Sequence, residues 1–244
     1  MDVLSDVLSW LKVEGTVTRR SEFSAPWGIS YPLTNLASFM VVEKGSCFLL
    51  IEGVEEPLRL EAGDLVMFSP GNQTSLVDQL STPTVPYAQV LKECTLPQID
   101  KYDLEQNSYP TLRYGRGGSQ TVIRGWGLRL EGYEQHPLLT VLPSFIHITY
   151  EQRSTLPRLE TILSFIIHET YKKEEGSDMM IIRLLDLLFV QVIRTWFREQ
   201  PEGQAGWLGA LRDKPIRHAL KLIHQYPADP WTVESLGKTV GMSR

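Results

Sequence analysis

The spacing of apolar residues divides the chain into a β-rich first half and a helical second half. Short apolar runs of strand length alternate with Gly, Pro, Asn and Asp turns between about residues 15 and 96. The run at 65–68 is entirely apolar and lies between Gly63-Asp64 and a turn at Ser69, which is typical of a strand buried on both faces. Several short strands at this spacing favour a β sandwich or barrel.

Five segments carry the strand pattern most clearly. In chain order they are SFMVVEKG, SCFLLIEG, PLRLEAGDLVMFSPG, TVPYAQVLKEC and QTVIRGWGLRL. Glu43, Lys44 and Gly45 predict a tight hairpin between the first two. The last segment, residues 120–130, is expected to form one or two strands. It follows a polar loop at about 98–119, which is long enough to lie over the mouth of a barrel.

Two longer segments, 156–175 and 177–198, have the apolar period of helices and are separated by Gly176. The second is apolar around most of its circumference between Met179 and Val192, so it must be covered on more than one face. Burial within one chain and an interface with a second copy both meet that requirement.

The stretch from Asp213 onward predicts two further helices with identifiable ends. The first runs over about 215–224, where Asp213 can accept from free N–H groups at its start. The second follows Thr232, a good N-cap residue, and Gly241 ends it in the left-handed conformation. Their apolar stripes are Ile216, Leu220 and Ile223, then Val233, Leu236 and Val240.

Composition narrows the class of protein. The chain has 244 residues, enough for one or two domains, and a net charge of −5. Basic residues nonetheless outnumber acidic ones between Leu211 and Arg244. This excess is consistent with a nucleic-acid-binding segment attached to an acidic domain, and ordinary solvated surface charge explains it equally well. No long apolar run lacks charge, so no membrane-spanning segment is expected. The two cysteines and the lack of a basic leader favour the cytoplasm.

The sequence of the C-terminal segment resembles a known family. Residues 219–244, ALKLIHQYPADPWTVESLGKTVGMSR, resemble the first helix-turn-helix of the AraC-type transcription regulators. The resemblance implies sequence-specific DNA binding in the full-length form. It places Ser243 and Arg244 at the start of the base-reading helix and makes Lys221 and Lys238 phosphate contacts. In that family more helices follow, so this chain is expected to be truncated within its first helix-turn-helix and to lack base-specific affinity alone.

A second resemblance covers most of the remaining chain. The stretches WGISYP, KGSCFLLIEG, LEAGDLVMFSPG, PLLTVLPSFIHI and GWLGALRDKPIRHAL are similar to the cupin-type sensor branch of the same family. It implies an α+β fold with a cupin-like β barrel, an antiparallel helical pair and a partial helix-turn-helix. The expected domains are an effector-sensing barrel at 1–150, a helical pair at 151–200, a linker at 201–211 and a DNA-binding part at 212–244. Helices at 156–198 imply a homodimer.

This chain departs from the metal-binding cupins. In the resembling branch, histidines commonly stand where this sequence has Met40 and Thr74, and neither residue replaces an imidazole as a transition-metal ligand. No histidine precedes His136. The sequence therefore predicts no metal site in the barrel and no cofactor.

Five residues are candidates to line a pocket for a small-molecule effector. They are Tyr31, Met40, Phe48, Met67 and Thr74. Met and aromatic side chains in strands more often pack a core than bind a ligand, so core packing is the simpler interpretation and the pocket is the alternative.

Catalytic motifs are absent from the sequence. There is no G-x-S-x-G, H-E-x-x-H, C-x-x-C or phosphate-binding glycine loop, and Glu131, Glu134 and His136 form an ordinary polar turn. The sequence predicts an effector-responsive transcription regulator that is not an enzyme. The alternatives are a stand-alone cupin-type binder or enzyme, and a module that pairs with full-length relatives.

Overall fold

The computed structural model describes residues 13–94, 111–130, 142–172, 174–200, 213–226 and 228–242. The chain divides into two compact units. The first comprises Val13–Glu131 and Leu142–Val192, and the second includes the described residues from Ile193 onward. The predicted linker at 201–211, most of the predicted loop at 98–119, and Ser243 and Arg244 lie outside the described residues.

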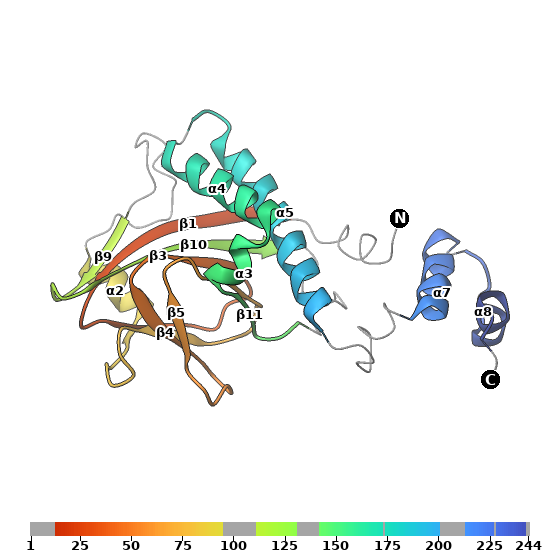
Figure 1. Ribbon diagram of the computed structural model, residues 1–244, viewed down its shortest axis with the longest axis horizontal. Coiled ribbons are helices and arrows are strands. Elements are labelled where there is room, and N and C mark those ends of the chain that lie inside the picture. The colour runs from red at the N-terminus through yellow and green to blue at the C-terminus, as the bar shows by residue number, and fades with distance from the viewer. Residues whose placement is uncertain are drawn as a thin grey trace. The chain divides into compact units, whose positions relative to one another are not determined.

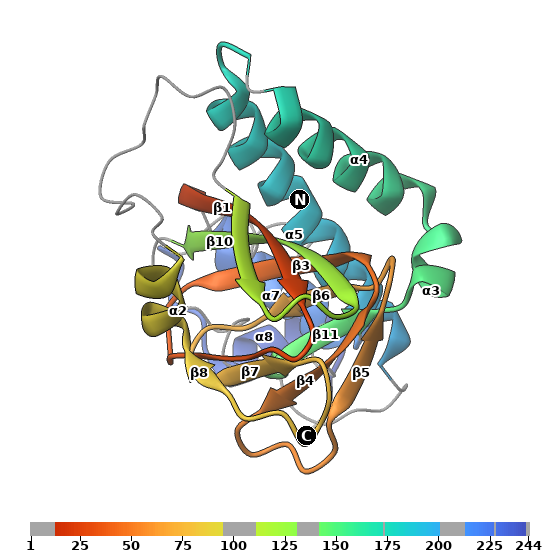
Figure 2. The same cartoon turned by 90° about the vertical axis from the view of Figure 1, so that its left-hand side faces the viewer.

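Two facing β sheets form the first unit (Figures 1 and 2). The larger sheet has the order β11-β6-β3-β10-β1-β9. Its strands are β1 (Val13–Ser24), β3 (Ala37–Lys44), β6 (Leu65–Phe68), β9 (Thr111–Gly115), β10 (Gln120–Leu130) and β11 (Phe145–Ile148). The smaller sheet has the order β5-β4-β7-β2-β8. Its strands are β2 (Gly28–Tyr31), β4 (Ser46–Ile51), β5 (Leu58–Glu61), β7 (Thr74–Val77) and β8 (Val85–Pro86). This arrangement confirms the predicted cupin-like barrel.

The core of the barrel lies between the sheets. Strand side chains alternate between two faces, and the inward-facing apolar ones meet in a single buried cluster. Its members include Phe23, Trp27, Ile29, Met40, Val42, Cys47, Leu49, Leu76, Leu112 and Ile123.

A glycine forms the tight turn between β3 and β4. Gly45 has φ +78, a conformation that L side chains rarely adopt. A Cβ atom there would also lie 2.4 Å from the carbonyl oxygen of Gln120. Both facts require glycine at this position. The predicted hairpin is nevertheless wrong, because β3 and β4 do not pair with each other and belong to different sheets, so the turn carries the chain from one sheet to the other.

One predicted strand is wrong. Most of the TVPYAQVLKEC segment forms a helix, α2 (Tyr87–Glu93), after the two-residue strand β8. Tyr87, Val90, Leu91 and Cys94 recur at helical spacing and pack against the barrel core. The apolar positions therefore satisfy a helix, although the segment has strand-like composition.

The predicted polar loop also contains structure. Strand β9 lies within its second half and pairs in parallel with β1, from Arg20 opposite Thr111 to Ser24 opposite Gly115. Leu112, the apolar residue of β9, is fully buried in the barrel core.

Helices cover the outer face of the larger sheet. The short helix α3 (Tyr150–Ser154) leads into α4 (Pro157–Lys172), and α5 (Ser177–Glu199) follows. The bounds of α4 and α5 confirm the predicted helical pair. Within the first unit, α4 and α5 lie beside β1 and β10 in both views (Figures 1 and 2). The outward side chains of the sheet are correspondingly buried, among them Phe39, Met67 and Trp126.

The second unit contains the two predicted C-terminal helices, α7 (Lys214–Gln225) and α8 (Val233–Val240). The Asp213 carboxylate accepts from the Ile216 N–H at 2.9 Å, and Thr232 forms a capping box with Ser235. Gly241 ends α8 with φ 76. The ends of both helices agree with the prediction. The predicted apolar stripe of α8 is wrong at Val233, because this side chain is 92% exposed.

A buried ion-pair cluster joins the outer face of the sheet to α4. Glu43 accepts from Arg20 at 3.2 Å and from Arg124, whose side chain is only 2% exposed. The Arg124 guanidinium also lies over the Tyr171 ring, 4.4 Å from its centroid. Glu43 is thus the acceptor that compensates a guanidinium removed from water.

We predict that Glu43→Gln lowers the free energy of unfolding by about 3 kcal/mol or more, because it leaves the Arg124 charge buried without a carboxylate. Urea denaturation monitored by circular dichroism measures this change. The matched control is Glu61→Gln, whose partner Arg59 is 62% exposed. That control is expected to cost less than about 1 kcal/mol. Equal costs for the two variants would contradict the prediction.

Candidate functional site

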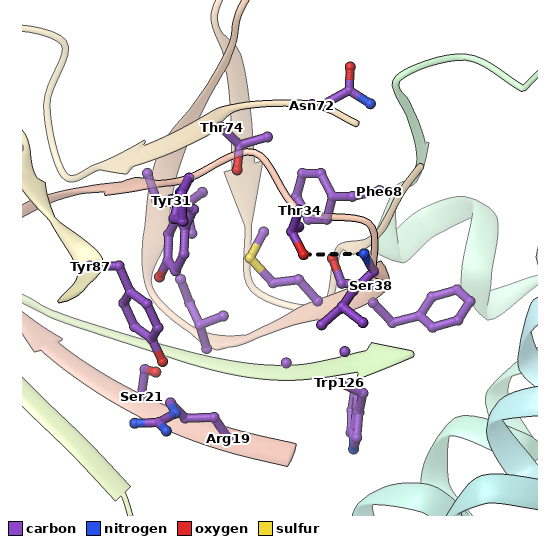
Figure 3. A pocket seen from close by; sticks show the side chains of 18 of the residues that line it. Arg19, Ser21, Tyr31, Thr34, Ser38, Phe68, Asn72, Thr74, Tyr87 and Trp126 are labelled. Atoms are coloured by element: carbon purple, nitrogen blue, oxygen red, sulfur yellow. Dashed lines mark hydrogen bonds between the residues drawn. The ribbon is translucent and has the colours of Figure 1, made fainter. Parts of the chain in front are cut away.

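A cavity of about 350 Å³ lies between the two sheets of the first unit. Its wall is built from β1, β3, β6 and β10 of the larger sheet, β2 and β7 of the smaller sheet, and α2 (Figure 3). This volume falls at the lower end of the range for small-molecule sites, about 300–1,000 Å³.

The cavity is open because β10 carries a glycine at its centre. Gly125 pairs with Arg19 of β1 on one side and with Met40 of β3 on the other. A Cβ atom at Gly125 would meet only the Phe39 carbonyl oxygen, at 3.6 Å. A larger side chain there would extend into the cavity without backbone strain. A glycine inside a strand commonly marks such an approach of a ligand or backbone.

Most of the wall is apolar. Met40, Phe68, Leu76 and Ile123 contribute side chains to it, together with Leu36 from the loop before β3. Trp126 also borders the cavity, but its indole points away from it, toward the helices (Figure 3). The free energy of ligand binding would therefore come mainly from burial of apolar surface.

One corner of the cavity is polar. It is formed by Arg19, Ser21, Tyr31 and Tyr87 (Figure 3). The rings of Tyr31 and Tyr87 pack with centroids 4.9 Å apart, and the Arg19 guanidinium lies 5.7 Å from the Tyr87 centroid. Burial raises the pKa of both phenols, and the nearby Arg19 charge opposes the rise only in part. Both tyrosines are therefore neutral at physiological pH and able to donate a hydrogen bond.

The polar groups at the other end are engaged by the protein itself. Thr34 accepts from the Leu36 N–H at 3.2 Å, as the dashed line in Figure 3 shows. Ser69 donates to the Pro143 carbonyl at 2.6 Å, and Asn72 donates to the Ser69 carbonyl at 3.0 Å. These groups fix the loop at that end.

Three of the five residues predicted for the pocket line this cavity. They are Tyr31, Met40 and Thr74. Phe48 does not line it, because Cys47 and Leu49 on either side point into the core and β4 alternates. Met67 lies opposite Phe39 on the outward face of the larger sheet and is fully buried there. A role of any of the five in binding stays a prediction.

Sequence reasoning missed Arg19 and Gly125. A signal for Gly125 was present, because the segment QTVIRGWGLRL places two glycines within an otherwise strand-like run. The sequence gives no signal for Arg19, since an arginine in a strand is normally expected on the solvent side.

The described residues hold no group of three or more His, Cys, Asp and Glu side chains that could bind a metal ion. Cys47 is a buried free thiol, as its apolar surroundings predicted. Burial, with a smaller contribution from the Asp64 charge, raises its pKa to about 12, so it is not a reactive nucleophile.

The candidate DNA-contacting lysines lie on separate helices of the second unit. Lys221 is exposed on α7. Lys238 on α8 is 77% exposed and pairs with Glu234 at 3.0 Å, one helical turn away. Their contact with DNA stays a prediction.

Comparisons with known proteins show what this chain is similar to. A family model described as Cupin matches residues 2–198. An AraC-like transcription regulator of Streptomyces lividans is 26% identical over 247 aligned residues, which cover 100% of this chain and 75% of that protein. AlkR, an HTH-type transcriptional regulator of Acinetobacter baylyi, is 39% identical over 109 residues, 44% of this chain and 35% of that protein. The crystal structure of apo ToxT from Vibrio cholerae aligns with a TM-score of 0.44 at 9% identity, over 96% of this chain and 73% of that one.

The chain belongs to the cupin family. It is also similar to AraC-like transcription regulators, over its whole length to the Streptomyces lividans protein and over 44% of its length to AlkR. Among the described residues, no helix is both long enough and apolar enough to cross a membrane.

Proposed function

We propose that this chain acts as an effector-responsive, DNA-binding transcription regulator, and that the effector binds in the cavity between the sheets. The observation that carries the proposal is the opening at Gly125. A packed core would fill that space, because protein interiors are close-packed and an empty volume is destabilising. Catalysis is not part of the proposal, since the cavity wall carries no metal-binding group or activated nucleophile among the described residues.

Filling the cavity is expected to abolish effector binding. Ligands from a small-molecule library that raise the melting temperature of the wild-type protein should lose that effect in Gly125→Leu and keep part of it in Gly125→Ala. The reason is steric, because the leucine side chain extends into the cavity. Thermal-shift assays followed by calorimetry measure the loss.

The matched control is Arg59→Leu, which adds the same side chain on the exposed surface of β5. It should respond as the wild-type protein does. Undiminished binding to Gly125→Leu would place the effector outside the cavity and refute this site.

We further propose that α7 and α8 face the phosphate backbone of DNA. The family relationship supports it, and Lys221 and Lys238 supply exposed charges on the two helices. Contacts of this kind position a protein on DNA without reading sequence.

Lys221→Ala and Lys238→Ala should each weaken binding to a short random-sequence duplex. The slope of log affinity against log salt concentration should become shallower by about 1 for each substitution, since each releases one fewer counterion. Fluorescence anisotropy across a salt series measures the slope. Lys92→Ala, on the exposed side of α2, is the control and should leave it unchanged. Slopes that are identical in all four proteins would contradict the contact.

A homodimer through the helices at 156–198 is the third element of the proposal. Apolar side chains of α4 and α5 stand about half exposed in one copy: Phe165 is 53% exposed and Leu187 52%. Met179 and Met180 on α5 are exposed to a similar degree. A second copy would remove these side chains from water.

Leu187→Glu is expected to convert a dimer at micromolar concentration into a monomer, because the charge would be buried in the interface. Size-exclusion chromatography with light scattering measures the mass. Leu80→Glu, a position 55% exposed in a barrel loop, is the control and should leave the dimer intact. A wild-type protein that is monomeric under the same conditions would overturn this part of the proposal.

A further inference from the structure

We propose that the effector is a small apolar molecule with one negatively charged group, a carboxylate, which Arg19 binds in the polar corner of the cavity. This inference rests on the proposed function, because it specifies the ligand class of the same site. It goes beyond that function by assigning the charge of the ligand and the residue that recognises it.

Arg19 has an unsatisfied donor inside the protein. Its Nη1 atom is buried and has no hydrogen-bond partner among the residues that the structure describes. None of the ion pairs between described residues includes Arg19, although its neighbour Arg20 bonds to both Glu22 and Glu43. A buried cationic donor without a partner is costly, and a bound anion would remove that cost.

The position of Arg19 is set by the strand pairing. Arg19 and Ser21 point toward the cavity, whereas Arg20 and Glu22 point to the opposite face. Arg19 stands directly opposite Gly125, so no side chain on β10 fills the space beside its guanidinium. The Tyr87 ring supports the guanidinium from one side at 5.7 Å.

The same corner supplies neutral donors to a carboxylate. The buried phenols of Tyr31 and Tyr87 keep their protons because burial raises their pKa. In Figure 3 the Tyr87 hydroxyl lies toward Ser21 and Arg19. An arginine with adjacent hydroxyl donors is a suitable set for a carboxylate, since all can donate and the guanidinium offers a bidentate fork.

The rest of the wall limits the ligand to one such charge. No Asp or Glu lines the cavity among the residues that the structure describes, so a cationic ligand would find no compensating carboxylate on them. Arg19 is also the only Lys or Arg among its described lining residues. Away from the polar corner the wall is mainly apolar, with Met40, Phe68 and Ile123 as examples, so the remainder of the ligand has to be apolar.

Matched probes test the charge. Hydrocinnamate and its neutral amide, hydrocinnamamide, have the same shape, as do octanoate and octanamide. Calorimetry on the wild-type protein should show each carboxylate binding at least about ten-fold more tightly than its amide. In Arg19→Met the carboxylates should lose about ten- to one-hundred-fold in affinity, while the amides change less than about two-fold. Arg113→Met, which removes an arginine that is 73% exposed, is the control and should bind as the wild-type protein does.

A stability measurement separates recognition from a structural role. Arg19→Met should melt at the same temperature as the ligand-free wild-type protein or higher, because it removes an unpartnered buried donor. A large loss of stability would instead make Arg19 a structural residue and overturn the inference.

The outcomes also separate this inference from the proposed function. Amides that bind as tightly as carboxylates, and lose binding in Gly125→Leu, would refute the charge and keep the effector site. If none of the four probes binds the folded protein, the carboxylate inference fails, and the library screen on the Gly125 variants decides effector binding independently.

Discussion

The alternation of side chains along β10 is the constraint on which the first unit depends. This strand pairs with β1 along one edge and with β3 along the other, so it lies inside the larger sheet with one face toward the cavity and the other toward the helices. Ile123 and Gly125 face the cavity, whereas Arg124 and Trp126 face the helices. A slip of one residue would exchange the two sets and place a guanidinium and an indole between the sheets. The register is therefore fixed by what each face can accept.

The face of the larger sheet that lies under α4 and α5 accommodates the charge of Arg124 because partners for that charge are present there. Arg124 is almost fully buried, yet Glu43 accepts from it and Tyr171 lies over it. Glu43 also holds Arg20, so one carboxylate organises cations from two strands beneath α4. Such clusters add little net stability compared with apolar packing, but they penalise any arrangement that separates the partners. The cluster thus favours one placement of α4 on the sheet.

Structural features that depend on contacts between residues close in sequence could be predicted, whereas features that depend on distant residues could not. The ends of α7 and α8 follow from Asp213, Thr232 and Gly241, which act within one helical turn, and they were predicted closely. Strand β6 is buried on both faces and does not alternate, so nothing in the sequence decided on which face Met67 would lie. The helix α2 is short, and an apolar segment of that length satisfies a strand or a helix equally well before the rest of the fold is known.

The cavity combines two features that each oppose stability. A glycine within a strand loses more conformational entropy on folding than alanine, at a cost of about 0.5–1 kcal/mol, and it packs nothing. A buried guanidinium nitrogen without a partner costs more. Gly125 and Arg19 are paired in the strand register, so these two destabilising features lie at the same point of the barrel. Local conflicts that coincide are typical of a binding site, where the ligand supplies the missing volume and the missing acceptor.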